Sequence, residues 1–161
     1  MSLADILGCE QIMPDLRAAD RWEAIDELVG LLVATGRIKA ADRDCVASVI
    51  KKREHSMSTG IGFGLAFPTA TTDVIGTAIM ALGRSRNGVE FDALDRQPVK
   101  IVMLVLVPMG QRQENLNLLH TLSEIFNCVP FQRAIEQAPD AAAIHKIFAQ
   151  REKDLIAPES S

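Results

Sequence analysis

The sequence is poor in the residues that build disulfide frameworks and metal centres. It holds three cysteines and three histidines among 161 residues. Cys9, Cys45 and Cys128 lie far apart and no C-x-x-C pair joins them, so neither a disulfide framework nor a zinc site is predicted. Buried free thiols in a reducing compartment are the simpler interpretation. No metal and no cofactor is predicted.

Long hydrophobic runs and a basic surface are also missing. The longest apolar run, residues 101–109, is too short to cross a bilayer. The first residues lack the charged and apolar regions of a secretory signal, so a cytoplasmic protein without membrane insertion is expected. The net charge of −4 argues against a nucleic acid partner, because neutralising phosphates requires a concentrated basic surface.

The composition fits an ordinary globular domain. Hydrophobic residues make up 48% of the chain and charged residues 24%, which is usual for soluble domains. We predict one domain over residues 1–156, followed by a disordered tail at 157–161.

Apolar residues at helical spacing predict several helices. Asp20 and Glu23 resemble a capping box, apolar residues then recur on one helical face, and Gly36 marks the stop. Further helices are expected at the following places: about residues 41–53, 112–126 and 140–150, and a short one that opens at Pro130.

The middle of the chain predicts strands. Residues 61–67 alternate between bulky and small side chains, which indicates a strand that Pro68 ends. Residues 74–82 and 99–107 predict two more, and the second is almost uniformly apolar, as expected of a central strand covered on both faces. A turn is expected at 87–88. Helices on either side of these strands predict an α/β fold with the sheet between helices.

The segment 53–69 reads R-E-H-S-M-S-T-G-I-G-F-G-L-A-F-P-T. It resembles the active-site segment of enzyme IIA domains of the fructose/mannitol/nitrogen-regulatory (type 2) family, from the bacterial sugar phosphotransferase system (PTS). That family segment reads roughly R-E-x-x-x-S-T-G-I-G-x-G-I-A-I-P-H. Residues 90–99 and 106–122 resemble later family segments, so the likeness spans about residues 20–150. It implies the enzyme IIA fold, a mixed, partly parallel sheet sandwiched between helices.

The resemblance also implies a phosphoryl carrier that has lost its acceptor. The last residue of the family segment is the histidine that carries the phosphoryl group, and Thr69 takes its position here. The family's second active-site histidine falls at Asn115. A neutral imidazole is nucleophilic near pH 7, whereas a threonine hydroxyl needs an activating base. Both active-site histidines are therefore expected to be replaced, and whether this chain is enzymatically active stays open.

The three histidines of this chain offer one alternative acceptor. His55 lies inside the matching segment and is the candidate for a relocated phosphorylation site. His120 and His145 are expected on solvent-exposed helix surfaces.

Several residues of the segment suit an anion. Arg53 offers a planar fork for phosphate or carboxylate. Ser58 and Thr59 offer hydroxyl groups, and the backbone around Gly60 can turn N–H groups toward a ligand.

Three functions follow as hypotheses. The first is a non-phosphorylated regulatory or protein-binding variant of the nitrogen-regulatory type, whose partners are the PTS phosphocarrier protein or regulatory targets. The second is an active phosphocarrier with its acceptor at His55. The third is a small-anion sensor that uses a pocket at Arg53 and Thr59.

Overall fold

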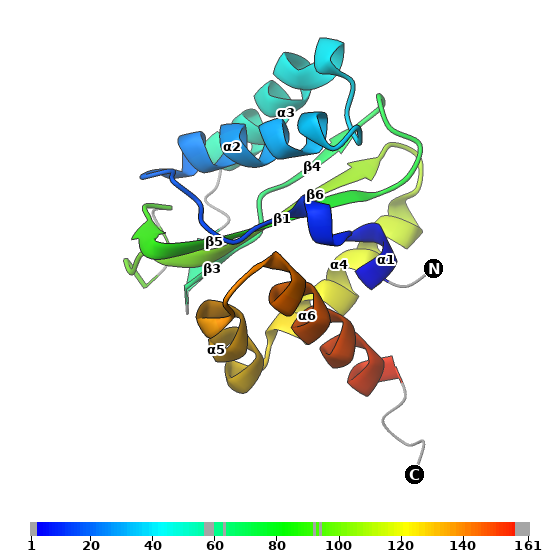
Figure 1. Cartoon of the computed structure of the whole chain (residues 1–161). Helices are drawn as coiled ribbons and strands as arrows, with labels where there is room; N and C mark the ends of the chain where they lie inside the picture. The colour runs from blue at the N-terminus through cyan, green and yellow to red at the C-terminus, as the bar shows by residue number, and fades with distance from the viewer. Residues whose placement is uncertain (1–2, 57–59, 63, 92, 94, 157–161) are drawn as a thin grey trace.

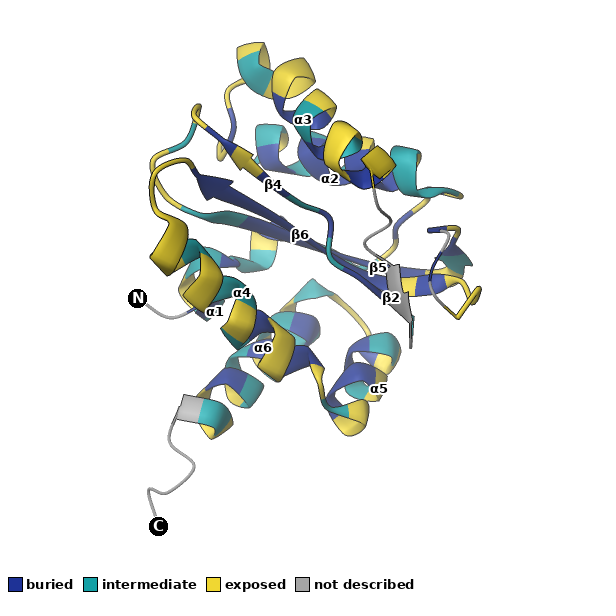
Figure 2. Ribbon diagram, turned by 180° about the vertical axis from the view of Figure 1, so that it is seen from behind, coloured by how far each residue is buried: buried dark blue, intermediate teal, exposed yellow. Residues whose placement is uncertain are grey.

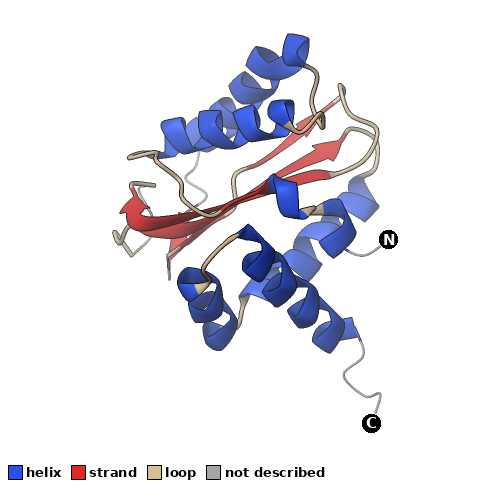
Figure 3. Cartoon of the chain, viewed as in Figure 1, coloured by secondary structure: helices blue, strands red, loops and turns tan. Residues whose placement is uncertain are grey.

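A mixed sheet of six strands runs through the middle of the molecule, with helices on both of its faces (Figure 1). The computed structural model describes the following residues: 3–56, 60–62, 64–91, 93 and 95–156. The tail predicted at 157–161 lies outside the described residues. Coloured by secondary structure, the strands form one layer between two layers of helices (Figure 3).

The helices and strands alternate in blocks along the chain. The helices are α1 (Leu3–Ile6), α2 (Arg21–Ala34), α3 (Arg43–Ser56), α4 (Arg112–Phe126), α5 (Val129–Gln137) and α6 (Ala141–Ile156), with short 3-10 turns at Cys9–Gln11 and Ala40–Asp42. The strands are β1 (Ile12–Met13), β2 (Gly60–Gly62), β3 (Leu65–Ala66), β4 (Thr69–Thr72), β5 (Ile79–Val89) and β6 (Val99–Pro108). The helices predicted from sequence are confirmed, and Asp20 caps α2 by accepting a hydrogen bond from the Glu23 N–H at 2.9 Å.

The sheet has the mixed, partly parallel topology that the resemblance implied. Its strand order is β1-β5-β6-β3-β2, and β4 also pairs with β6. β6 is antiparallel to β5 but parallel to β3 and β4, and β1 is parallel to β5. Helices α2 and α3 cover one face of this sheet, and α4, α5 and α6 cover the other (Figure 1).

The central strand β6 supplies both hydrophobic cores. From Ile101 to Pro108 every residue is buried, as the dark ribbon of β6 shows (Figure 2). Side chains of a strand point alternately to opposite faces. Val102, Leu104 and Leu106 therefore pack in the core beneath α2 and α3, while Met103 and Val105 pack in the core against α4–α6. The prediction of a central strand covered on both faces is confirmed.

The glycine-rich segment is not the single strand predicted over residues 61–67. Gly64 has a φ of +76°, a left-handed conformation that glycine adopts without strain. The chain reverses there, so β2 and β3 pair antiparallel. Phe63 lies outside the described residues. Large and small residues do alternate along this segment, but the turn at Gly64 divides the segment into two strands.

Pro68 interrupts the sheet edge without ending it. β3 and β4 share one register beside β6, with Leu65 opposite Ile101 and Thr69 opposite Val105. The Pro68 carbonyl accepts a hydrogen bond from the Val105 N–H at 2.8 Å. A proline cannot donate to a ladder, but it can still accept. The strand does end before Pro68, at Ala66, but the sheet edge was not predicted to resume, and β4 follows at once.

The bounds of β5 also differ from prediction. The strand begins at Ile79 and continues to Val89 through the turn expected at 87–88. A register shift between Arg84 and Val89 accommodates the irregular backbone there. Gly88 has a φ of +94° and packs so closely on Pro98 that a Cβ atom would lie 2.6 Å from its side chain. The glycine bends the strand instead of closing a hairpin.

The cysteines are free, but they are not buried as predicted. Cys45 is exposed on α3, and Cys9 and Cys128 are partly exposed. Cys45 lies in the first turn of α3, where Arg43 and Asp44 are exposed as well. In the described part of the chain, no helix is both long enough and apolar enough to span a membrane.

A buried arginine joins the sheet to the helical layer of α5. Arg84 is 1% exposed and donates to the carbonyls of Pro14 at 2.8 Å, Ile135 at 3.0 Å and Ala138. Burial lowers the pKa of Arg84, and the charge of Arg86 lowers it further. The C-terminal carbonyls of α5 carry the negative end of the helix dipole. They compensate the guanidinium charge where a carboxylate would ordinarily do so.

We expect Arg84→Met to lower the free energy of unfolding by about 3 kcal/mol, because the buried carbonyls of Ile135 and Ala138 and the partly buried carbonyl of Pro14 lose their donor. Urea denaturation followed by circular dichroism measures the change. Arg86→Met is the matched control, since Arg86 is exposed and pairs with Asp15 at the surface, and a shift within about 0.5 kcal/mol is expected. Equal stabilities of the two variants would contradict the role given to Arg84.

Candidate functional site

The residues predicted to bind an anion do not form a site within the described structure. Arg53 lies exposed in the last turn of α3. Ser58 and Thr59 lie outside the described residues, and Gly60 begins β2, opposite Ala66. Anion binding by this group therefore stays a prediction.

The glutamate next to Arg53 has a structural role that sequence reasoning missed. The Glu54 side chain is fully buried and pairs with Arg21 at 3.4 Å. The Arg21 guanidinium also lies 4.5 Å from the centre of the Trp22 ring. This contact fixes the end of α3 against the start of α2, immediately before the segment that leads to Thr69. Arg21 and Glu54 lie far apart in the sequence, so the sequence did not indicate that they pair.

Thr69 begins β4 and faces the α4 layer. Side chains of β4 alternate, so Ala70 packs in the core under α2 and α3 while Thr69 and Thr71 point the other way. The Thr69 hydroxyl donates a hydrogen bond to the Phe67 carbonyl at 2.9 Å, and the residue is half-buried. Its proton is therefore already committed to the backbone two residues earlier.

Asn115 reaches the same place from the first turns of α4. After β6 the chain turns at Gly110, whose φ is +84°, and α4 begins at Arg112. The Asn115 side-chain amide donates to the Pro108 carbonyl at 3.0 Å. This hydrogen bond holds the start of α4 against the end of β6.

Thr69 and Asn115 line one shallow pocket of about 270 Å³. The other lining residues are Thr71, Val107, Gly110, Arg112, Leu116 and Leu119. The structure thus brings together the two positions that the resemblance assigned to active-site histidines. The described residues that line the pocket include no histidine and no carboxylate, so none of them can take a proton from the Thr69 hydroxyl near pH 7.

One exposed apolar side chain, Leu116, lines this pocket, and a second, Met109, adjoins it in the sequence. Among the described residues, the large hydrophobic side chains that are exposed are Val74, Met109, Leu116 and Val129. Leu116 lines the pocket, and Met109 directly precedes its residue Gly110. Met109 is 60% exposed and Leu116 52%. From the sequence alone, Met109 and Leu116 could not be distinguished from the neighbouring apolar residues that are buried in the core.

The three histidines lie outside the pocket. His55 is exposed at the end of α3, with its ring centre 6.3 Å from that of Trp22. His120 is exposed on α4 and lies 2.9 Å from Glu124, which confirms the predicted surface position. The predicted surface position of His145 was wrong. The residue is half-buried, because α1 packs on α6 there. Its Nε2 forms a hydrogen bond with the Ala4 carbonyl at 2.9 Å.

Comparison with known protein families identifies the family of this chain. The model of the family described as phosphoenolpyruvate-dependent sugar phosphotransferase system, EIIA 2, matches residues 5–151. The chain belongs to this family. The predicted resemblance is confirmed, and it covers the sheet, both helical layers and the pocket at Thr69.

Relatives of this enzyme IIA chain include a fructose-specific EIIA component and a nitrogen regulatory protein. It is 30% identical over 148 residues to the PTS system fructose-specific EIIA component of Haloferax volcanii, covering 92% of this chain and 95% of that protein. The crystal structure of nitrogen regulatory protein IIA-Ntr from Neisseria meningitidis superposes with a TM-score of 0.81 at 27% identity, covering 91% of this chain and 98% of that one.

A second structure supports the fold alone. The complex of enzyme IIAMTL and phosphorylated enzyme IIBMTL from Escherichia coli superposes with a TM-score of 0.74 at 18% identity, covering 89% of this chain and 97% of that one. The family match makes the chain a PTS enzyme IIA-like protein, and nitrogen regulatory proteins are among the relatives that it resembles.

We expect Glu54→Ala to lower the free energy of unfolding by about 2 kcal/mol, because it leaves the partly buried Arg21 without its carboxylate. Thermal and urea denaturation give the value. Asp26→Ala serves as control, since Asp26 pairs with Lys51 at the surface and such pairs contribute at most about 1 kcal/mol. If Asp26→Ala proved the more damaging substitution, the Arg21–Glu54 pair would not hold the helix ends together.

Proposed function

We propose that this enzyme IIA relative is not phosphorylated and acts by binding partner proteins through the surface around Thr69 and Asn115. One observation carries the proposal. The side chains at both histidine positions donate their hydrogen bonds to backbone carbonyls, at 2.9 Å and 3.0 Å, in a pocket whose described lining holds no base.

The chemistry of phosphoryl transfer supports this conclusion. A hydroxyl becomes a nucleophile when a neighbouring base accepts its proton. The Thr69 proton instead points to the Phe67 carbonyl, which is far too weak a base to accept it. A phosphate ester on threonine would also be more stable than a phosphoramidate, so the group would stay on the protein. Thr69 therefore suits contact with a partner and not transfer to one.

The surface around the pocket supports protein binding. Met109 and Leu116 are large apolar side chains with more than half of their surface exposed. A soluble domain leaves such neighbouring side chains uncovered mostly where another protein packs on them. Arg112, also exposed at the start of α4, adds a cation at the edge of this patch. The partner expected here combines an apolar centre with acidic or hydrogen-bonding groups around it.

The relatives support a partner from the same system or from regulation. One structure of this fold is a complex of an enzyme IIA with a phosphorylated enzyme IIB, and another is a nitrogen regulatory protein. A phosphocarrier protein that still recognises the enzyme IIA surface, or a regulatory target that replaces it, fits the patch. The protein would then exert its regulatory effect by forming a complex with this partner.

We expect no gain of mass when the wild-type protein is incubated with phosphoenolpyruvate, enzyme I and the phosphocarrier protein. Intact mass spectrometry measures the result, with a phosphorylatable enzyme IIA as positive control. The Thr69→His/Asn115→His double variant is expected to gain one acid-labile phosphoryl group, because an imidazole at position 69 is nucleophilic without a separate base.

An acid-labile phosphate on the wild-type protein would overturn the proposal. His55→Ala would then decide whether the acceptor has moved to His55: loss of the label would identify that residue, and an unchanged label would place the acceptor elsewhere. An acid-stable label would point to a hydroxyl group.

The double variant also tests the docking patch. With Leu116→Glu added, we expect the initial rate of labelling to fall at least about tenfold, because a carboxylate would interrupt the apolar contact. Lys100→Glu is the matched control, since Lys100 is exposed at the opposite end of β6. Time courses of intact mass compare the two. Equal rates would exclude the patch at Leu116 as the docking surface.

A further inference from the structure

A second site candidate lies on the opposite helical layer. Helices α2 and α3 pack side by side in antiparallel orientation, and an open groove of about 510 Å³ runs between them. Trp22 and His55 line one end, and the Asp26–Lys51 ion pair, 2.8 Å long, crosses the middle. None of the residues lining this groove lines the pocket at Thr69, so the two sites are separate.

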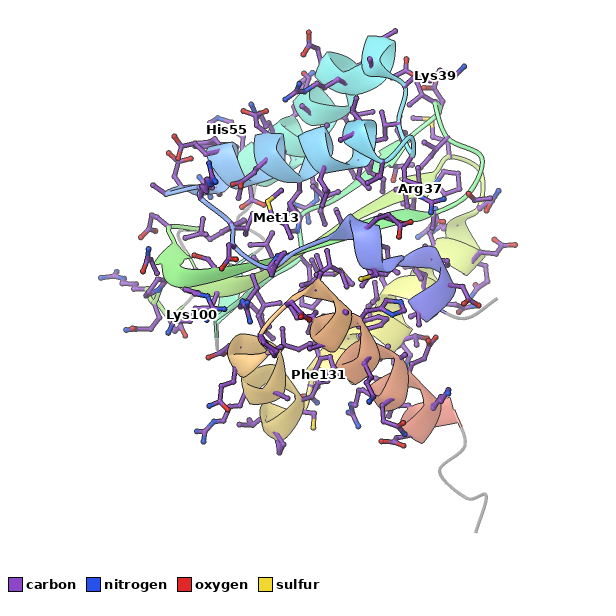
Figure 4. The ribbon with its side chains drawn as sticks, in the orientation of Figure 1. Met13, Arg37, Lys39, His55, Lys100 and Phe131 are labelled. Atoms are coloured by element: carbon purple, nitrogen blue, oxygen red, sulfur yellow. The ribbon has the colours of Figure 1, made fainter. Side chains whose placement is uncertain are left out.

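The aromatic end of the groove is held in place. The Trp22 ring is half-buried, with the Arg21 guanidinium 4.5 Å from its centre, and Arg21 is itself fixed by the buried Glu54. His55 lies on the other helix, its ring tilted by 44° to the indole. Figure 4 shows His55 beside the start of α2. An indole fixed in this way offers a flat ring a contact surface at little cost in side-chain entropy.

The charged side chains are distributed unevenly along the groove. Lys52 lies near the aromatic end, is exposed, and has no carboxylate within ion-pair distance among the described residues. Asp44 lies eight residues earlier on α3, about 12 Å away along the helix. An anionic group is therefore attracted to the end at Trp22 and repelled from the other. Between them, the Asp26 carboxylate can accept hydrogen bonds from hydroxyl groups.

The lining argues for a small ligand rather than a protein face. None of the exposed large hydrophobic side chains of the described chain lies in this groove. Small residues, Ala47 and Ser48, form part of its lining. Its volume falls within the range of small-molecule sites, roughly 300–1,000 Å³. One aromatic surface, an exposed cation beside it and a nearby carboxylate suit a ring, a phosphate and a hydroxylated linker.

We propose that the groove between α2 and α3 binds a purine nucleoside monophosphate, with the base on Trp22, the phosphate at Lys52 and the ribose toward Asp26. The helix that carries Lys52 and His55 runs directly into the segment that leads to Thr69. Occupancy would therefore be sensed at the end of α3, which the Arg21–Glu54 pair positions.

Intrinsic fluorescence tests the proposal directly. Trp22 is the single tryptophan and the chain has no tyrosine, so the signal comes from this groove alone. Titration of the wild-type protein with AMP and with GMP is expected to give saturable quenching by at least one of them, with half-saturation below about 1 mM. Adenosine is expected to bind at least about fivefold more weakly than AMP, and inorganic phosphate alone to leave the fluorescence unchanged.

Two variants locate the phosphate. Lys52→Gln is expected to raise the half-saturating concentration at least about fivefold, because it removes the cation beside the ring. Lys100→Gln, at a lysine on β6 that is also exposed (Figure 4), is expected to leave it unchanged. Linear, non-saturating quenching by both nucleotides up to about 5 mM, or equal affinity of the wild type and Lys52→Gln, would overturn the proposal.

Discussion

The burial of β6 on both faces is the constraint on which the rest of the structure depends. A strand with apolar side chains on both sides requires a helical layer on each face, and it fixes the register of every strand beside it. That register places Thr69 opposite Val105. The end of the same strand, at Pro108, provides the carbonyl that holds Asn115. The pocket therefore forms where the start of β4 meets the start of α4, and β6 positions both of them.

Two buried charges then fix the helices in place, Arg84 by joining β5 to α5 and Glu54 by joining α3 to α2, and they use different partners. Glu54 has a cation, Arg21, at 3.4 Å, whereas Arg84 is compensated mainly by carbonyls at the end of α5. Both join segments that are distant in sequence. A charge removed from water is costly unless such contacts surround it, so each fixes one arrangement of the two segments that it joins.

Much of the fold could be predicted, since helical periodicity and capping at Asp20 are local and β6 is uniformly apolar. The errors occurred where backbone conformation decided the outcome. A turn at Gly64 split one predicted strand, and Pro68 continued a sheet edge that it was expected to end. At the site, the family resemblance indicated positions 69 and 115, but only the fold shows that they line one pocket. The exposure of Leu116 and the Arg21–Glu54 pair depend on tertiary packing and left no signal in the sequence.

The position of Pro68 has a consequence for solubility. Within the described chain β4 has a neighbouring strand, β6, on one side only, so its other edge offers backbone groups to any extended chain. An uncharged edge of threonines and alanine has no repulsive side chain to prevent such pairing. The proline before it cannot donate a hydrogen bond, and β4 is only four residues long. A short edge that begins at a proline is a poor template for a second strand, which protects the molecule against edge-to-edge aggregation.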